Sequence, residues 1–183
     1  MTADSGTVVA VSRDTAHRVS KVPQDEITLL AGIGVEGDAH AGITDQHRHT
    51  KRRDPHRPNL RQVHLIQSEL FDELAAHGYA VEPGRLGENI TTSGVDLLAL
   101  PAGTRLHLGG EAVVEITGLR SPCKLINQVA DGLLKAVVAT GRGKEIPQRT
   151  GVMSIVVAGG VVRPGDGIRI ELPAGEHRTL QIV

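Results

Sequence analysis

The fold is decided by the stretch Thr104–Asn127, TRLHLGGEAVVEITGLRSPCKLIN. Two apolar runs, Thr104–Leu108 and Ala112–Thr117, flank Gly109-Gly110, a two-residue turn signal, and together they predict a β-hairpin. The second run extends to Leu119 and leads into a segment that holds the only cysteine of the 183-residue chain. The sequence therefore predicts that this thiol follows directly on a strand.

The residues around the cysteine predict a short helix. Ser121 is a good N-cap residue, Pro122 suits the first helical position, and Leu125 and Ile126 begin an apolar face. This pattern places Cys123 in the first turn of the helix, where backbone N–H groups are unpaired and the helix dipole is positive.

Cys123 is therefore the main candidate for chemistry. The helix terminus and the neighbouring Arg120 and Lys124 all favour a thiolate, which could act as a nucleophile, a sulfur carrier or a metal ligand. The alternative is a buried structural cysteine, the commoner role of a lone Cys.

The rest of the chain predicts a mainly β fold. With 22 glycines and nine prolines, short strands joined by turns are favoured over long helices. We expect one domain over residues 1–183, a closed or partly closed β-barrel with a few peripheral short α-helices, with a core over about 26–172 and tails at 1–6 and 173–183. Besides the hairpin, the expected strands cover residues 7–11, 27–30, 62–67, 86–92, 153–158 and 168–172, and the expected helices cover 69–77 and 133–139.

Composition excludes several classes of protein. Aromatic residues make up 1% of the chain, which disfavours stacking platforms for single-stranded nucleic acid. A single cysteine cannot form an internal disulfide. There is no apolar run near 18 residues and no signal-peptide pattern over Met1–Val11, so we expect a cytoplasmic protein that does not bind a membrane.

Positive charge is concentrated in one segment. Between His47 and Arg61 lie six Lys or Arg residues and one acid, Asp54, although the whole chain has a net charge of −1. Residues 42–59 have no apolar period and predict a long exposed loop. Such a loop favours an anionic ligand, and the alternative is a solvated insertion.

Histidines also gather here, at His40, His47, His49 and His56. A zinc site on His47 and His49 is one interpretation, but the spacing matches no compact zinc pattern. Asp38 and His40 are held together by a glycine-rich turn, so the carboxylate could orient the imidazole as in many active sites. The alternative is a turn-capping Asp beside an exposed His.

Four stretches occur together in a characteristic order: GVEGDAHAG (Gly34–Gly42), QVHLI (Gln62–Ile66), LGENITT (Leu86–Thr92) and RSPCKLIN (Arg120–Asn127). In this respect the chain resembles the MOSC family, the domain that forms the C-terminus of molybdenum-cofactor sulfurases, and most of all its free-standing bacterial members. The resemblance implies a β-barrel, which agrees with the strand pattern.

The resemblance also implies a function. Cys123 would carry sulfur or ligate the molybdenum of a molybdenum-pterin cofactor, with which some relatives reduce N-hydroxylated compounds. The expected reaction is a two-electron reduction or a sulfur or oxo transfer. Asp38 and His40 would line the pocket, with His40 as a proton donor. The family's Gly-x-Asn stretch maps onto Gly87, Glu88 and Asn89, which are candidate cofactor-binding residues. Arg85 and Arg120 are candidates on charge grounds only, and Lys124 and Asn127 of the cysteine segment complete the set.

The expected partners are a small-molecule substrate or the pterin cofactor, and a redox or sulfur-donor protein. Two other functions stay open at this point. One is a metal-free persulfide carrier that uses Cys123, and the other is a non-enzymatic module that binds an anionic metabolite through the basic segment. RNA is disfavoured by the lack of aromatic residues.

Overall fold

The computed structural model describes residues 5–138 and 149–183. Its strands are β1 (Gly6–Arg13), β2 (Val22–Gln24), β3 (Ile27–Leu30), β4 (Gly34–Val35), β5 (Val63–Gln67), β6 (Ile90–Ser93), β7 (Arg105–Leu108), β8 (Ala112–Leu119), β9 (Val152–Ala158), β10 (Gly160–Val162) and β11 (Gly167–Glu171). The helices are α1 (Arg48–Arg53), α2 (Glu69–Ala76) and α3 (Leu133–Val138), with 3₁₀ helices η1 (Leu97–Ala99) and η2 (Lys124–Gln128).

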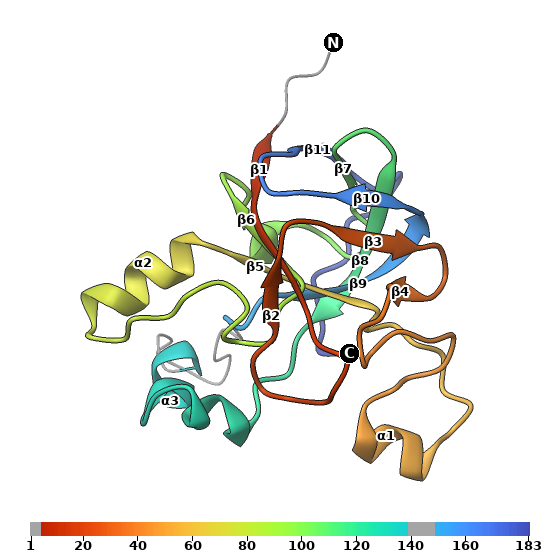
Figure 1. Ribbon diagram of the computed structural model, residues 1–183. Coiled ribbons are helices and arrows are strands. Elements are labelled where there is room, and N and C mark those ends of the chain that lie inside the picture. The colour runs from red at the N-terminus through yellow and green to blue at the C-terminus, as the bar shows by residue number, and fades with distance from the viewer. Residues whose placement is uncertain (1–4, 139–148) are drawn as a thin grey trace.

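The main sheet closes into a barrel. Its strand order is β11-β7-β8-β9-β5-β6-β1, and an additional pairing of β11 with β1 completes the ring, while β2 extends from β1. A second sheet has the order β10-β3-β4. The predicted mainly β barrel with short peripheral helices is confirmed, and Figure 1 shows α2 and α3 on one side of it and α1 projecting at another. None of the described helices is long and apolar enough to cross a membrane.

The hairpin of β7 and β8 is confirmed, but its turn is longer than predicted. Leu108 pairs with Ala112, so three residues rather than two connect the strands. Gly109 adopts a φ of +61°, a left-handed conformation that costs glycine little. The sequence signal located the turn correctly but not its length.

Two apolar clusters hold the fold. The first fills the barrel and is built from aliphatic side chains such as Val8, Leu65, Leu106 and Val114, which agrees with the scarcity of aromatic residues. The second lies between the helices and the outside of the barrel, and consists of Ile66, Leu70, Phe71, Leu74, Val81, Leu86, Ile126, Leu133 and Val137. Through Ile126, this second cluster anchors the turn that follows Cys123.

The ends of the chain differ from the prediction. The core begins with β1, where Val8 and Val11 are buried, well before residue 26. Residues 173–183 run along the barrel rather than away from it, because Arg178 bridges to Ala102 and Leu180 is only 5% exposed. The helix predicted over 133–139 is α3, and residue 139 lies outside the described residues.

Candidate functional site

A cleft of about 920 Å³ opens at one end of the barrel. The segments that line it lie after β1 (residues 17–21), between β4 and β5 (residues 40–61), just before β6 (residues 85–89) and after β8 (residues 120–129). They meet because the strand register places the end of β8 (Leu119), the start of β9 (Val152), Leu65 of β5, the start of β6 (Ile90) and Val11 of β1 in one row of paired residues. The volume falls within the usual range for small-molecule sites.

The lining of the cleft is strongly basic. It contains five histidines and the acid Asp45, but no Phe, Tyr or Trp. The cations that line it are Arg18, Lys21, Arg48, Arg52, Arg61, Arg85 and Arg120. A concave surface with this charge attracts anions and does not offer aromatic stacking.

One side of the cleft is a closed polar cluster, the Asp38 network, formed by Asp38, Lys21, His40 and Asn89. Asp38 Oδ2 accepts hydrogen bonds from Lys21 Nζ at 2.6 Å and from Asn89 Nδ2 at 3.1 Å. Asp38 Oδ1 accepts from the His40 backbone N–H at 2.9 Å and lies 3.2 Å from His40 Nδ1. The carboxylate is therefore saturated by protein donors.

Burial and pairing set the charges of this network. Burial by itself would raise the pKa of Asp38, but the hydrogen bond with His40 and the charge of Lys21 outweigh it and hold that pKa well below its usual range. Burial lowers the pKa of His40, and the hydrogen bond with Asp38 only partly offsets this. Since an ionised carboxylate cannot donate, His40 carries its proton on Nδ1 and leaves Nε2 as an acceptor.

This geometry changes the predicted role of His40. The resemblance suggested a proton donor, but a neutral imidazole protonated on Nδ1 first has to accept a proton on Nε2. His40 lines the cleft and its side chain is 30% exposed, so Nε2 can meet a ligand. The predicted pairing of Asp38 with His40 is present in the structure, and it orients the ring.

Asn89 and Glu88 act within the protein rather than on a ligand. Asn89 Nδ2 donates to Ser12 O and to Asp38 Oδ2, and its Oδ1 accepts from the His64 N–H, so both amide hydrogens are used. Glu88 is 0% exposed, accepts from the backbone N–H of Gly84, and does not line the cleft. Burial raises the pKa of Glu88.

The turn that carries Arg85 depends on glycine. Gly87 has a φ of +85°, and a Cβ atom there would lie 2.7 Å from the carbonyl oxygen of Val19. The close approach lets this turn pack against residues 19–21 and places both Arg85 and Gly87, two of the candidate cofactor-binding residues, on the cleft.

A second part of the cleft lining is the Arg120 wall, formed by Arg120, Arg61 and Cys123. Nη1 of Arg120 is buried and has no hydrogen-bond partner among the described residues. Burial lowers the pKa of Arg120 and of Arg61, and for both the charge of Cys123 acts in the opposite direction. The wall therefore holds desolvated positive charge beside a thiol, without an acidic residue bonded to it.

The local structure of Cys123 differs from the prediction. Cys123 is the N-cap residue of η2, with an extended backbone (φ −125°, ψ 161°), and does not lie inside a first α-helical turn. The helix starts two residues later than Pro122 suggested and is 3₁₀, because Ile126 is drawn into the apolar cluster and its N–H bonds to Cys123 O at 3.1 Å. The thiol is exposed in the cleft rather than buried.

The structure brings most predicted site residues together. Cys123, His40, Arg120, Asn89, Gly87 and Arg85 line the cleft, and Asp38 lies directly behind His40. Lys124 and Asn127 do not line it. Asn127 instead accepts from the N–H of Leu134 at 2.8 Å, a bond that supports α3.

Sequence reasoning missed His17 and Lys21. Both lie in the segment between β1 and β2, and no local sequence pattern marks them. The His17 ring meets the His40 ring at 4.9 Å in an edge-on arrangement, and His17 Nε2 lies 2.9 Å from Gln46 O. A buried Lys that pairs with an Asp 17 residues later leaves no periodic signal.

The basic segment is more ordered than a loop. Residues 48–53 form α1, which buries none of its residues. Thr44 and Pro58, which flank this helix in the sequence, form an isolated β-bridge at the base of the segment. Across residues 5–138 and 149–183, no three His, Cys, Asp or Glu side chains come together as a metal-binding group, so His47 and His49 are not part of such a site.

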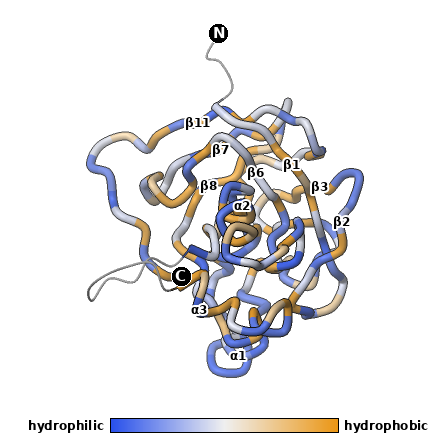
Figure 2. Tube along the Cα trace, turned by 90° about the vertical axis from the view of Figure 1, so that its left-hand side faces the viewer, coloured by the Kyte–Doolittle hydropathy of each residue, from blue (hydrophilic) through white to orange (hydrophobic). Residues whose placement is uncertain are grey.

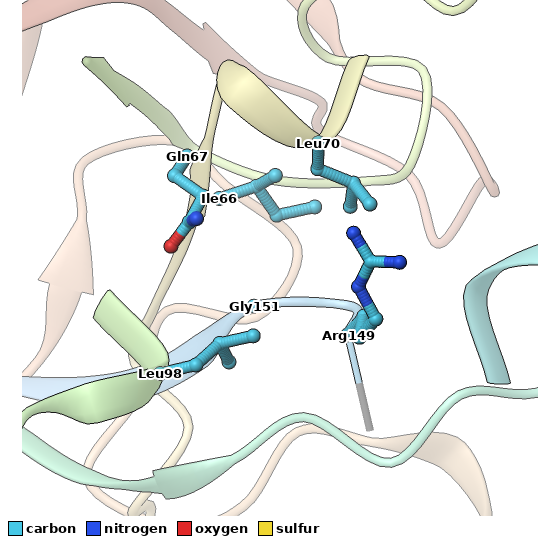
Figure 3. Close-up of a pocket in the computed structure, with 6 residues that line it drawn as sticks. All are labelled: Ile66, Gln67, Leu70, Leu98, Arg149 and Gly151. Atoms are coloured by element: carbon cyan, nitrogen blue, oxygen red, sulfur yellow. The ribbon is translucent and has the colours of Figure 1, made fainter. Parts of the chain in front are cut away.

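A second hollow lies beside α2 and has a different character (Figure 3). It is lined by Ile66, Gln67, Leu70, Leu98, Arg149 and Gly151, and its volume is about 10 Å³. That space suits at most about one water molecule. The basic cleft is therefore the better candidate site.

Comparison with known proteins places the chain in a family. Residues 52–169 match the MOSC domain. Similar solved structures include YuaD from Bacillus subtilis (23% identity, TM-score 0.71, covering 90% of this chain and 94% of that one). They also include YiiM from Escherichia coli (19% identity, TM-score 0.62, covering 94% and 73%) and YiiM from Geobacillus stearothermophilus (18% identity, TM-score 0.60, covering 91% and 73%). No curated protein matches the chain significantly.

Proposed function

The chain belongs to the MOSC domain family, and from that membership and the cleft we propose that it binds a molybdenum-pterin cofactor. Arg120 and Arg61 would hold the anionic phosphate of the pterin, and Cys123 would be the protein ligand of molybdenum. The single observation that carries the proposal is the buried, unpartnered Nη1 of Arg120 beside the exposed thiol.

The residues present fit such a group. A guanidinium N–H that lacks a partner costs free energy unless a ligand supplies an acceptor, and phosphate oxygens accept from Arg in a well-matched geometry. A thiolate is the soft ligand that metals of this kind prefer. When bound, the cofactor supplies two-electron redox chemistry or sulfur and oxo transfer.

The protein's own residues divide the remaining tasks. Asp38 holds the His40 ring in one tautomer, and His40 Nε2 accepts a proton at the cleft and can return it to a ligand. Lys21 balances the charge of Asp38 from a buried position. Asn89 fixes the distance between these groups by bonding to Ser12, Asp38 and His64.

The proposal is tested by analysing the full chain after co-expression with a working molybdenum-cofactor pathway. We expect molybdenum and released pterin in comparable amounts in the wild type, and loss of the molybdenum in Cys123→Ser. Lys124→Gln is the matched control, because Lys124 neighbours the thiol in sequence but does not line the cleft. A wild-type protein with neither molybdenum nor pterin contradicts the proposal.

A second candidate function rests on the exposure of the only thiol. Cys123 lines an open basic cleft and has no second cysteine to form a disulfide with, so it could carry a persulfide for delivery to an acceptor. Cyanide would then release thiocyanate from the metal-free protein, and Cys123→Ser would abolish the release. Thiocyanate without bound molybdenum would favour this function over the first.

A further inference from the structure

Helix α1 is unusual because packing does not explain it. It is six residues long, buries none of them, and its N-cap residue His47 forms no side-chain cap bond. Its segment is clamped at the base, where Asn59 Nδ2 donates to His40 O and Gly42 O at 2.9 Å each. Figure 2 shows α1 as a hydrophilic end of the molecule. The basic helix α1 is therefore held in place by the base of its segment and not by contacts with the apolar core.

Two arginines of α1 face the cleft together. Arg48 and Arg52 are four positions apart, so they lie on the same face of the helix, and both line the cleft along with His49. Neither guanidinium forms a hydrogen bond or ion pair with any described residue. Like charges at this spacing repel, and the repulsion is relieved when an anion lies between them.

The other cations of α1 are arranged differently. Lys51 Nζ donates to Gln46 Oε1 at 2.8 Å, and neither Lys51 nor Arg53 lines the cleft. The α1 cations that lie in the cleft without a hydrogen bond or ion pair are therefore Arg48 and Arg52. This placement favours a small ligand within the cleft over a macromolecule laid on the outer face of the helix.

The charge of this pair is additional to that of the Arg120 wall. A phosphate and a thiolate at the wall account for Arg120 and Arg61, and they leave Arg48 and Arg52 without an anion. We propose that Arg48 and Arg52 form a subsite for the anionic group of the substrate, so that the substrate is a small molecule bearing a carboxylate or a phosphate. This inference rests on the proposed function, since it assigns the wall to the cofactor.

The match to the MOSC domain begins at Arg52, inside α1. Arg48 therefore precedes the matched segment, and Arg52 is its first residue. The proposed subsite lies in the connection between β4 and β5, in which residues 47–61 hold six Lys or Arg residues and one acid, Asp54.

The test compares the affinities of three matched ligands by calorimetry: benzamidoxime, which is neutral, and its 4-carboxy and 4-phosphono derivatives. We expect the better of the two anions to bind the wild type about tenfold more tightly than the neutral compound. Arg52→Gln should remove most of this preference, and Arg53→Gln, the same change one residue away and outside the cleft, should keep it. The preference should shrink as salt rises from about 0.05 to about 0.5 M.

The two anions distinguish a carboxylate from a phosphate substrate. Equal affinity for all three ligands, no binding of any of them, or equal losses in Arg52→Gln and Arg53→Gln would each overturn the inference. Tighter binding of a single-stranded RNA that depends equally on Arg52 and Arg53 would also overturn it. Repeating the titration with cofactor-free Cys123→Ser separates the two proposals, because anion preference there survives even if no molybdenum is ever found.

Discussion

The two sides of the cleft solve the problem of buried charge in opposite ways. In the Asp38 network, a buried carboxylate meets a buried ammonium at 2.6 Å, and further donors saturate it. In the Arg120 wall, a buried guanidinium nitrogen has no partner among the described residues and lies beside an exposed thiol. The first arrangement is complete without a ligand, whereas the second becomes complete only when an anion arrives.

This difference separates scaffold from binding surface. A saturated network contributes to stability and fixes the orientation of His40, but it has few donors left for a ligand. An unsaturated wall contributes little to stability and much to binding. Substitutions in the Asp38 network should therefore change mainly the free energy of unfolding, and substitutions in the Arg120 wall should change mainly the binding of the cofactor.

The largest effect should come from breaking the saturated side. Asp38→Ala leaves the Lys21 ammonium buried without its counter-charge, and we expect the free energy of unfolding to fall by about 3–5 kcal/mol. Urea unfolding followed by circular dichroism measures this loss. The double variant Asp38→Ala/Lys21→Met should cost clearly less than the sum of the two single changes, and strict additivity would contradict the pairing.

A smaller effect should appear as a dependence of stability on pH. Burial lowers the pKa of His40 and holds the pKa of His64 well below 6.5, so the folded state takes up these protons less readily than the unfolded chain. Their contribution is complete above pH 6.5 and is lost as the pH falls below it, by at most about 1.4 kcal/mol per pH unit for each proton. Asp38 acts in the same direction below its ordinary pKa of 3.8.

Unfolding free energies at pH 7.5, 6.5 and 5.5 check this slope. His64→Gln should flatten it, because Gln can still donate to Thr150 O, which lies 2.7 Å from His64 Nε2, and does not titrate. His49→Gln, a change at an exposed residue of α1, serves as the control. A slope that is the same in the wild type and in His64→Gln would show that His64 does not contribute.

On the unsaturated side, the expected effect on stability is smaller again. Arg120→Met removes a desolvated charge that has no hydrogen-bonded partner, so the free energy of unfolding should change by less than about 1 kcal/mol. The same urea unfolding as for Asp38→Ala makes the comparison direct. A loss of about 3 kcal/mol would mean that Arg120 is a structural residue and would remove the contrast between the two sides.

The smallest effect on stability should come from Cys123→Ser. The side chain is exposed and η2 is anchored by Ile126 instead, so the free energy of unfolding should stay within about 0.5 kcal/mol of the wild type. Differential scanning calorimetry gives the melting temperature of both proteins. A marked loss of stability would indicate that the thiol packs into the structure, contrary to its open position.

The sequence predicted the local elements better than the contacts between distant ones. The β-hairpin and the strand over 27–30 follow from alternating or apolar runs bounded by glycine, and they lie where expected. The single thiol and the Asp38-x-His40 turn could be singled out because each is a local pattern. Lys21 and His17 could not, since their roles depend on partners that only the closed barrel brings near.

The errors at the site have the same origin. Ser121 and Pro122 are good helix-start signals, but the burial of Ile126 in the second apolar cluster sets the start of η2 instead. Asn89 looked available for a ligand because the sequence does not show that Ser12 and Asp38 use both of its amide hydrogens. Tertiary contacts overrode the local preference in each case.

The central claim is that the Arg120 wall exists to hold an anionic cofactor. Its most direct test is the amount of pterin that co-purifies with Arg120→Met after co-expression with a working molybdenum-cofactor pathway, relative to the wild type. We predict that the folded variant retains about a tenth or less of the wild-type pterin, because one charged hydrogen-bonding contact is lost. Equal pterin in the two proteins would contradict the account.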